Sequence, residues 1–306
     1  MGLAHSRRLA GDDRASIAGF YDADIAAAEQ LRDSFATEAT VCHSLDELLQ
    51  SVDADAAVIG TPTSSHRNQI FACAERGWHV LTEKPLADTR DRIVELIDLA
   101  NSSPQHFMVG YQRRCWTLYR RLLKEVQSGH HGPIRAVTGV SCEYWQQTIG
   151  DTWRDDPMIN SGGYLGDAGS HKLDILFFVT GLRLQTLTAA TSGNCGSRVP
   201  IVSSVIGSLD GDVPLTLTFT GHTNSFHEEL FIHCEHADLI VRDYRLWIGR
   251  ENAVEEIELP ANESGRESVR NPVSEFLGLL EGGENIAPFE CALPVFDFTA
   301  EILGTS

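Results

Sequence analysis

The chain has 306 residues, which is long enough for two domains that each bury a hydrophobic core. Its 24 Lys and Arg residues against 43 Asp and Glu residues give a formal net charge of −19 at pH 7, and such a charge repels nucleic acid and anionic membrane surfaces. The seven cysteines are scattered without a CxxC pair, and no apolar run resembles a signal peptide or a membrane span. We therefore predict a cytoplasmic protein that binds neither nucleic acid nor membranes.

Strands and helices alternate over the first third of the chain. Helical segments with short links join four short apolar segments, which are predicted as buried strands over residues 16–21, 56–61, 79–84 and 106–111. This alternation predicts an α/β fold, a doubly wound parallel sheet with helices on both faces.

Polar residues follow these strands, where a doubly wound sheet binds its ligands. They are Asp22, Thr61, Pro62, Glu83, Lys84, Tyr111 and Gln112. A carboxylate at Asp22 suits a ribose diol and disfavours a 2′-phosphate, which favours NAD over NADP. A helix cap is the alternative role of Asp22.

The glycine-rich turn expected for a dinucleotide site is incomplete. The opening MGLAHSRRL looks like the end of a G-x-G-x-x-G fingerprint, with Gly2 as the third glycine and no strand before it. In the order 3-2-1-4-5-6 the first strand is central, so its loss leaves its two neighbours unpaired. We expect about ten further residues upstream in the natural protein; a genuine short form with impaired cofactor binding is the alternative.

The pattern changes after Arg113. Residues 113–124 carry the densest basic run, which predicts a helix with a solvated basic face. The second half is then rich in alternating strands separated by Gly, Pro, Asn and Asp turns, which predicts an α+β domain with a large, mainly antiparallel open sheet. The predicted domains are residues 1–112 and 113–306.

The stretch SGGYLGDAGSHKLD, residues 161–174, begins with paired glycines and continues into a predicted buried helix. Spacings of four and three place Asp167, His171 and Asp174 on one face of such a helix. A catalytic cluster and a satisfied core cluster both fit this pattern. Gly162 and Gly163 are expected to leave room for a ligand beside the backbone.

A metal site is not predicted. His233 and Cys234 are adjacent on a predicted strand and therefore point to opposite faces, and no CxxC or HExxH spacing is present.

Five motifs together resemble the Gfo/Idh/MocA oxidoreductases. They are MGLAHSRRL, TPTSSH (61–66), HVLTEKPLA (79–87), GYQRR (110–114) and GGYLGDAGSHKLD (162–174). The resemblance implies a Rossmann domain, a second domain for substrate binding and oligomerisation, a nicotinamide cofactor and a homo-oligomer that transfers a hydride at a sugar or polyol carbon. The absent first strand and first two glycines depart from the family pattern, as does Cys115, where an aromatic residue commonly follows the arginine.

The resemblance also assigns residues. Catalytic roles fall on Lys84, Asp167 and His171. The cofactor site would include Gly2, Asp22, Thr61, Pro62, His66, Glu83 and Gln112. Trp153 and Arg154 lie where members of the family often present substrate contacts.

These residue types suit alcohol oxidation. A histidine titrates near neutral pH, so His171 is the expected base for the hydroxyl proton, with Asp167 orienting its ring. Lys84, ending a strand of the other domain, would stabilise the developing alkoxide, and Asp174 is expected to be a structural partner of the helix. A non-catalytic nucleotide- and sugar-binding protein and a metal-dependent isomerase or lyase are the two alternatives.

Overall fold

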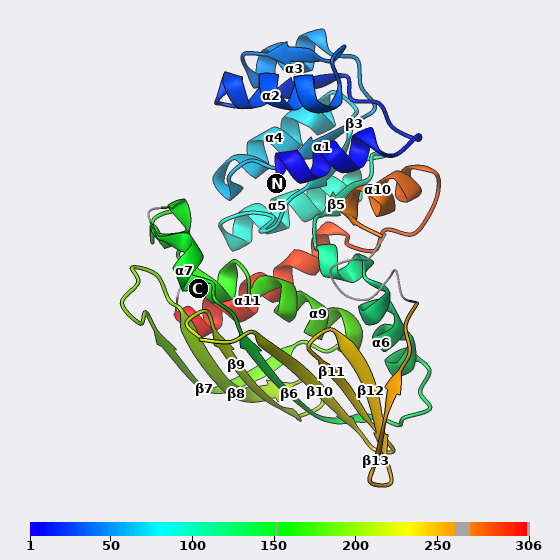
Figure 1. The fold of residues 1–306 in the computed structure, drawn as a ribbon, viewed down its shortest axis with the longest axis vertical. Helices are drawn as coiled ribbons and strands as arrows, with labels where there is room; N and C mark the ends of the chain where they lie inside the picture. The colour runs from blue at the N-terminus through cyan, green and yellow to red at the C-terminus, as the bar shows by residue number, and fades with distance from the viewer. Residues whose placement is uncertain (151, 261–269, 305–306) are drawn as a thin grey trace. The chain divides into compact units, whose positions relative to one another are not determined.

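A computed structural model describes residues 1–150, 152–260 and 270–304 of the chain (Figure 1). The chain forms two compact units, the first of Met1–Gln112 and Arg270–Leu293, the second of Arg113–Val269 and Pro294–Ser306. The units differ from the predicted division at one segment, because residues 270–293 belong to the first unit.

The returning segment joins the first unit through backbone pairing and helix packing. Helix α10 (Pro272–Leu280) packs against helix α1 (Gly2–Ala10). Beyond α10, the amide of Asn285 donates to Phe107 O at 2.8 Å, and Val109 N donates to Ala287 O at 2.9 Å. These bonds satisfy backbone groups at the free edge of the last parallel strand, which explains why the segment returns.

The first unit is a doubly wound α/β domain, as predicted. Its other helices are α2 (Ile25–Phe35), α3 (Leu45–Ser51), α4 (Thr63–Glu75) and α5 (Arg90–Ser102). Its strands are β1 (Gly19–Tyr21), β2 (Thr40–Cys42), β3 (Ala56–Ile59), β4 (His79–Thr82) and β5 (Phe107–Val109). Every pairing among them is parallel.

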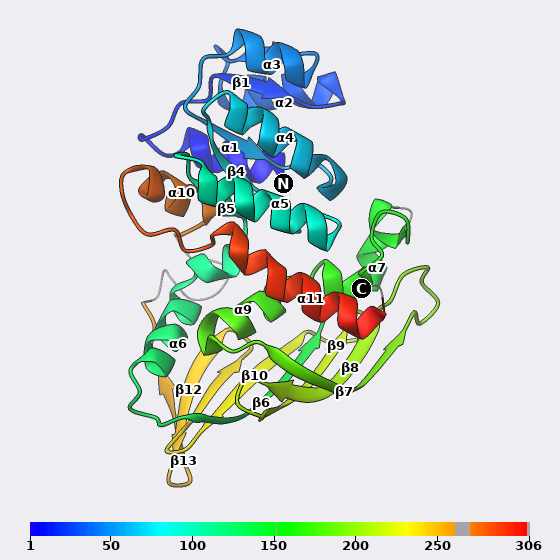
Figure 2. The same cartoon turned by 180° about the vertical axis from the view of Figure 1, so that it is seen from behind.

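The parallel sheet is in two parts. Strand β1 pairs with β2, and β3, β4 and β5 form a separate three-stranded sheet (Figure 2). Among the described residues no strand joins β1 to β3. The prediction that β1 and β3 are left without a pairing strand between them is therefore confirmed.

The second unit is built on an eight-stranded sheet with the order β13-β12-β11-β10-β6-β9-β8-β7. The strands are β6 (Ile134–Cys142), β7 (Leu184–Gly193), β8 (Val202–Leu209), β9 (Val213–Thr220), β10 (His227–Cys234), β11 (Asp238–Arg242), β12 (Arg245–Arg250) and β13 (Ala253–Ile257). Strands β6 and β9 pair in parallel and the other neighbours are antiparallel, which confirms the predicted sheet.

Helices cover one face of this sheet. They are α6 (Thr117–Gln127), α9 (Ser170–Thr180) and α11 (Ala292–Leu303) (Figures 1 and 2). The shorter elements of this half are η1 (Gln112–Cys115), α7 (Gln146–Ile149), η2 (Trp153–Asp155) and α8 (Gly163–Gly166), and η4 (Phe289–Cys291) precedes α11. Helix α9 is buried, as predicted, and its Phe177 ring meets the Phe298 ring of α11 edge to face at 5.8 Å.

Residues 238–249 form a β-hairpin. Strands β11 and β12 are joined at Asp243 and Tyr244, whose φ angles are 46° and 69°. Two successive left-handed residues are typical of a type I′ turn, whose twist matches that of the flanking strands. Asp-Tyr is not the usual Asn-Gly or Asp-Gly signal, so the turn was not recognised in the sequence.

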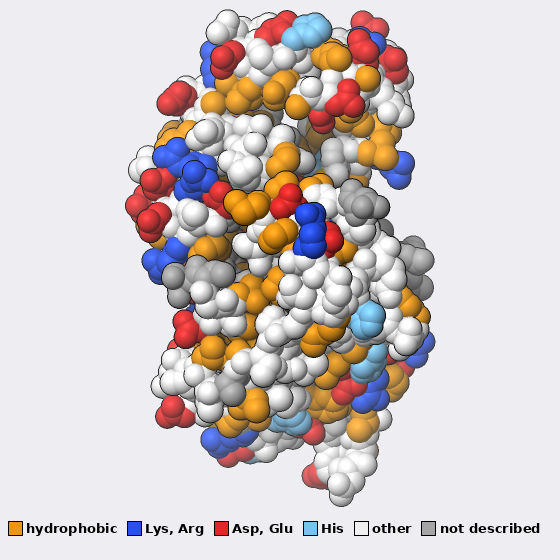
Figure 3. Space-filling view, turned by 90° about the vertical axis from the view of Figure 1, so that its left-hand side faces the viewer, with side chains coloured by type: hydrophobic (Ala, Val, Ile, Leu, Met, Phe, Trp, Pro, Cys, Tyr) orange, Lys and Arg blue, Asp and Glu red, His pale blue; other side chains and the backbone are white. Residues whose placement is uncertain are grey.

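The prediction of a solvated basic face over residues 113–124 is wrong for its first two residues. Arg113 and Arg114 are buried, and each forms an ion pair with a buried carboxylate. On the face drawn in Figure 3, basic side chains lie among acidic ones. None of the helices in the described part of the chain is both long and apolar enough to span a membrane.

Candidate active site

In the first unit, the turn after β3 is tied to the turn after β4 by His66. Thr61 and Pro62 lead into α4, and Thr61 Oγ1 donates to Gln69 Oε1 at 2.6 Å. The buried His66 ring has Nδ1 2.9 Å from Pro85 O and Nε2 2.9 Å from Thr61 O. Burial lowers the pKa of His66, although both carbonyl oxygens favour the charged ring. His66 therefore holds the two turns together from inside the unit.

Glu83 is buried and faces helix α1. Its Oε1 lies 2.7 Å from Nε2 of His5, which is also buried. Burial would raise the pKa of Glu83, but the hydrogen bond to His5 and the neighbouring His5 and Lys84 together lower it. Sequence reasoning missed His5, because nothing in the spacing of residues 78 positions apart signals this pair.

Three further cofactor candidates lie at the ends of elements. Gly2 begins α1, whose first turn has no side-chain cap. Asp22 is exposed after β1, and its Oδ1 accepts from Asp24 N at 2.9 Å. Asp24 rather than Asp22 caps α2, so the helix-cap alternative for Asp22 is wrong. Gln112 begins η1, and its N donates to Gly110 O at 2.8 Å.

In the second unit, residues 161–174 do not form the continuous helix that was predicted. The short helix α8 ends at Gly166, Asp167 follows with φ −92° and ψ −86°, and α9 begins at Ser170. His171 and Asp174 share α9, whereas Asp167 precedes it. The side chains of Asp167 and His171 are therefore not related by one helical turn.

Close backbone contacts explain two of the glycines in this stretch. Gly163 has φ +52°, and a side chain there would overlap the Pro200 carbonyl oxygen. Tyr164 N donates to that oxygen at 2.8 Å. A side chain at Gly169 would lie 2.7 Å from Leu165 O. These contacts within the protein account for Gly163 and Gly169, whereas the sequence predicted that the paired glycines make room for substrate.

Asp167 forms an ion pair with Arg154. Arg154 Nε donates to Asp167 Oδ2 at 2.9 Å, and the guanidinium carbon lies 4.4 Å from the centre of the Trp153 ring. Trp153 is 47% exposed, so one part of the ring holds the arginine while another part is open to solvent. The structure thus brings Trp153, Arg154 and Asp167 together.

Asp174 is fully buried and is held by Arg114. The guanidinium donates from Nε and Nη2 to the carboxylate, with distances of 2.7 to 3.0 Å. Burial raises the pKa of Asp174, and Arg114 opposes the rise. This geometry agrees with the expected structural role of Asp174.

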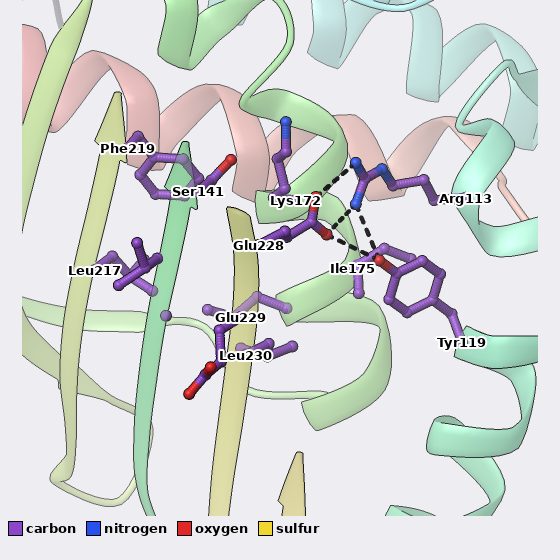
Figure 4. A pocket seen from close by; sticks show the side chains of 13 residues that line it. Arg113, Tyr119, Ser141, Lys172, Ile175, Leu217, Phe219, Glu228, Glu229 and Leu230 are labelled. Atoms are coloured by element: carbon purple, nitrogen blue, oxygen red, sulfur yellow. Dashed lines mark hydrogen bonds and ion pairs between the residues drawn. The ribbon is translucent and has the colours of Figure 1, made fainter. Parts of the chain in front are cut away.

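A cavity of about 30 Å³ lies between α9 and the sheet, with mainly apolar walls and a few charged side chains among them (Figure 4). Arg113 donates to both carboxylate oxygens of Glu228, and Tyr119 Oη donates to Glu228 Oε1 at 3.0 Å. Lys172 reaches the same region and donates to Glu143 Oε1 at 2.6 Å. Burial lowers the pKa of Lys172. A cavity of this size has room for water.

No group of three or more His, Cys, Asp or Glu side chains within the described ranges is arranged to hold a metal ion. His233 Nδ1 instead lies 3.0 Å from Asp238 Oδ1 on the neighbouring strand.

Family models match both halves of the chain. The model of the oxidoreductase family with an NAD-binding Rossmann fold matches residues 1–111. The model of the GFO/IDH/MocA C-terminal domain matches residues 119–240.

Curated relatives are similar at low identity. Inositol 2-dehydrogenase of Rhizobium meliloti is 26% identical over 192 residues, which are 63% of this chain and 56% of that protein. Levoglucosan dehydrogenase of Pseudarthrobacter phenanthrenivorans is 26% identical over 136 residues, 44% of this chain and 35% of that protein. The matched region thus spans about half the length of the inositol 2-dehydrogenase and about a third of the length of the levoglucosan dehydrogenase.

Solved structures share the fold over nearly the whole chain. An oxidoreductase domain protein from Kribbella flavida has a TM-score of 0.86 at 20% identity, covering 100% of this chain and 94% of that chain. A UDP-N-acetylglucosamine 3-dehydrogenase from Acidithiobacillus ferrooxidans has a TM-score of 0.81 at 17% identity, covering 100% and 94%. At these identities the likeness concerns the fold alone.

Proposed function

Because this chain belongs to the Gfo/Idh/MocA family of oxidoreductases, we propose that it oxidises a secondary alcohol of a sugar, inositol or related polyol with a nicotinamide cofactor. The observation that carries the proposal is the polar chemistry at the carboxyl ends of β1, β3 and β4, where parallel sheets bind their ligands. The two named relatives act, by their names, on an inositol and on an anhydrosugar.

The residues of the first unit fit a dinucleotide. The uncapped first turn of α1 presents backbone N–H groups that suit a phosphate, and Gly60 lies beside this turn, since a Cβ there would contact Gly2 N at 3.5 Å. The exposed carboxylate of Asp22 suits a ribose diol and favours NAD over NADP. The remaining candidates for contact with the cofactor, none of them buried, are Thr61, Pro62 and Gln112. Glu83 and His66 would act from inside, by holding the turns that meet the cofactor.

The proposed chemistry removes a hydride from carbon and a proton from oxygen. The bound cofactor would accept the hydride. We assign the proton to His171, which is half-buried at the start of α9, and stabilisation of the alkoxide oxygen to Lys84. Asp167, which is held by Arg154, would stabilise the positive charge on the protonated ring of His171. The open part of the Trp153 ring suits the apolar face of a sugar ring.

The test is a screen of sugars, inositols and amino-polyols with NAD and NADP. His171→Ala and Lys84→Ala should each lower turnover by about 10²-fold or more while NADH still binds. Binding of NADH without turnover of any polyol would show a non-catalytic protein instead. Loss of activity on exhaustive chelation would favour the metal-dependent alternative.

A homo-oligomer is also proposed, through the uncovered face of the large sheet. Register aligns Val140, Thr218 and Ser204 across β6, β9 and β8, and Ile206 lies two residues beyond Ser204 on the same face. Val140 is 39% and Ile206 55% exposed. Light scattering of Ile206→Lys against wild type tests whether this face forms the contact, with a lower mass expected for the variant.

A further inference from the structure

The turn that carries Lys84 is held on one side by a buried pair from helix α1. Glu83 immediately precedes Lys84, and its carboxylate lies 2.7 Å from His5 Nε2. The side chains of His5 and Glu83 are 4% and 9% exposed. Because a carboxylate only accepts hydrogen bonds, Nε2 of His5 must carry the proton.

The neighbouring backbone leaves Glu83 little freedom. Glu83 N donates to Ile59 O at 2.9 Å, and Gly110 N donates to Thr82 O at 2.7 Å. A side chain at Gly110 would lie 3.4 Å from the carboxyl carbon and from Oε1 of Glu83. The carboxylate thus lies close to the backbone of residue 110 while it reaches His5.

His5 has no second partner within the described part of the chain. Its Nδ1 is buried and makes no hydrogen bond. A buried polar ring satisfied on one side alone costs free energy relative to an apolar side chain of similar size. The hydrogen bond to Glu83 is therefore the polar contact that offsets the cost of burying the His5 ring.

We propose that His5 is a positioning residue, which acts through Glu83 to set the orientation of Lys84. Glu83 joins His5 to Lys84 as the next residue in the chain, while His66 holds Pro85 on the other side. Two buried histidines thus anchor the residues that flank Lys84. The functional consequence of this placement rests on the catalytic role proposed for Lys84.

The chain offers a direct readout of Lys84 that needs no substrate. It contains three lysines, Lys84, Lys124 and Lys172. Lys124 is exposed on α6, and Lys172 is half-buried and donates to Glu143 in the second unit. Competitive acetylation with isotope-labelled acetic anhydride, followed by mass spectrometry, gives the reactivity of Lys84 relative to Lys124, with Lys172 reporting whether the second unit is intact.

The variants separate the hydrogen bond from the volume of the ring. His5→Leu fills the space without a donor, whereas His5→Gln places an amide donor near the position of Nε2. We expect the relative reactivity of Lys84 to change by about threefold or more in His5→Leu, and to stay near the wild-type value in His5→Gln. Glu83→Gln, which weakens the same bond from the other side, should act like His5→Leu, and the double variant should add little.

In the enzyme assay, His5→Leu should lower kcat by about tenfold or more, with a smaller change in the KM for polyol. His5→Gln should keep most of the wild-type kcat. Unchanged Lys84 reactivity in both His5→Leu and Glu83→Gln would overturn the inference, whatever the activity. Altered Lys84 reactivity in these variants, together with no polyol oxidation by the wild-type protein, would support His5 as the positioning residue and refute the proposed function. If His5→Leu does not fold, the relative reactivity of Lys84 in Glu83→Gln decides between the two outcomes.

Discussion

The guanidinium of Arg154 donates from Nε to Oδ2 of Asp167 at 2.9 Å while it stacks on Trp153. This pair ties the segment before α8 to the acid that precedes α9. The resemblance had assigned Asp167 to catalysis and Arg154 to substrate, and the structure shows that the two side chains are partners.

Removing Arg154 should therefore impair Asp167 as well as substrate binding. Arg154→Ala is expected to lower kcat/KM by about 10-fold to 100-fold, because Asp167 loses a charge-assisted bond that orients it. Steady-state kinetics with a responsive polyol gives the measurement. Arg198→Ala is the matched control, since Arg198 is an exposed arginine that pairs with Asp155 at 3.6 Å, and it should retain activity. Equal effects in the two variants would contradict a specific role for Arg154.

Breaking the Arg114–Asp174 pair should destabilise the second unit. Asp174→Ala leaves a buried guanidinium without its carboxylate, which costs about 3–5 kcal/mol, whereas the double variant Arg114→Met, Asp174→Leu should cost less. Thermal unfolding measures both. Asp88→Ala, which removes an exposed pair with Arg92, should cost at most about 0.5 kcal/mol. A double variant as unstable as Asp174→Ala would show that lost packing dominates.

Acidification should destabilise the first unit through His66. Burial lowers the pKa of His66 below its ordinary value of 6.5, so the unfolded chain binds more protons than the folded chain as the pH falls. Stability is thus retained above pH 6.5 and lost as the pH falls towards the folded-state pKa. The urea midpoint of wild type should fall more than that of His66→Gln between about pH 7.5 and about pH 5.5.

The control for this titration is His43→Gln, which replaces an exposed histidine and should follow the wild-type curve. Parallel curves for wild type and His66→Gln would mean that His66 does not titrate differently in the two states.

Asp22→Ser should change the choice of cofactor. Loss of the carboxylate that we propose binds the ribose diol is expected to weaken NADH binding by about tenfold and to improve NADPH binding, because the 2′-phosphate would no longer meet a negative charge. Fluorescence titration with both cofactors gives the two constants. Asp13→Ser removes another exposed acid of the first unit and should leave their ratio unchanged. An unaltered ratio in Asp22→Ser would remove Asp22 from the cofactor site.

Local patterns in the sequence were sufficient to predict the parallel and antiparallel sheets and the missing strand between β1 and β3. They also supplied the motifs that place the chain in its family. Periodicity and turn chemistry act over a few residues, so they can be recognised without knowledge of the chain path. The role of Gly163 was misread because the Pro200 carbonyl, which occupies the space beside it, belongs to a segment far along the chain.

Other features depended entirely on the tertiary structure. The return of residues 270–293 to the first unit, the burial of Arg114 against Asp174 and the His5–Glu83 pair each join positions separated by at least 60 residues. A histidine, an arginine and two acids look alike in the sequence whether they are solvated or paired. Their partners are decided by which segments fold against one another, and burial then makes each pairing obligatory because an unpaired charge in the interior is costly.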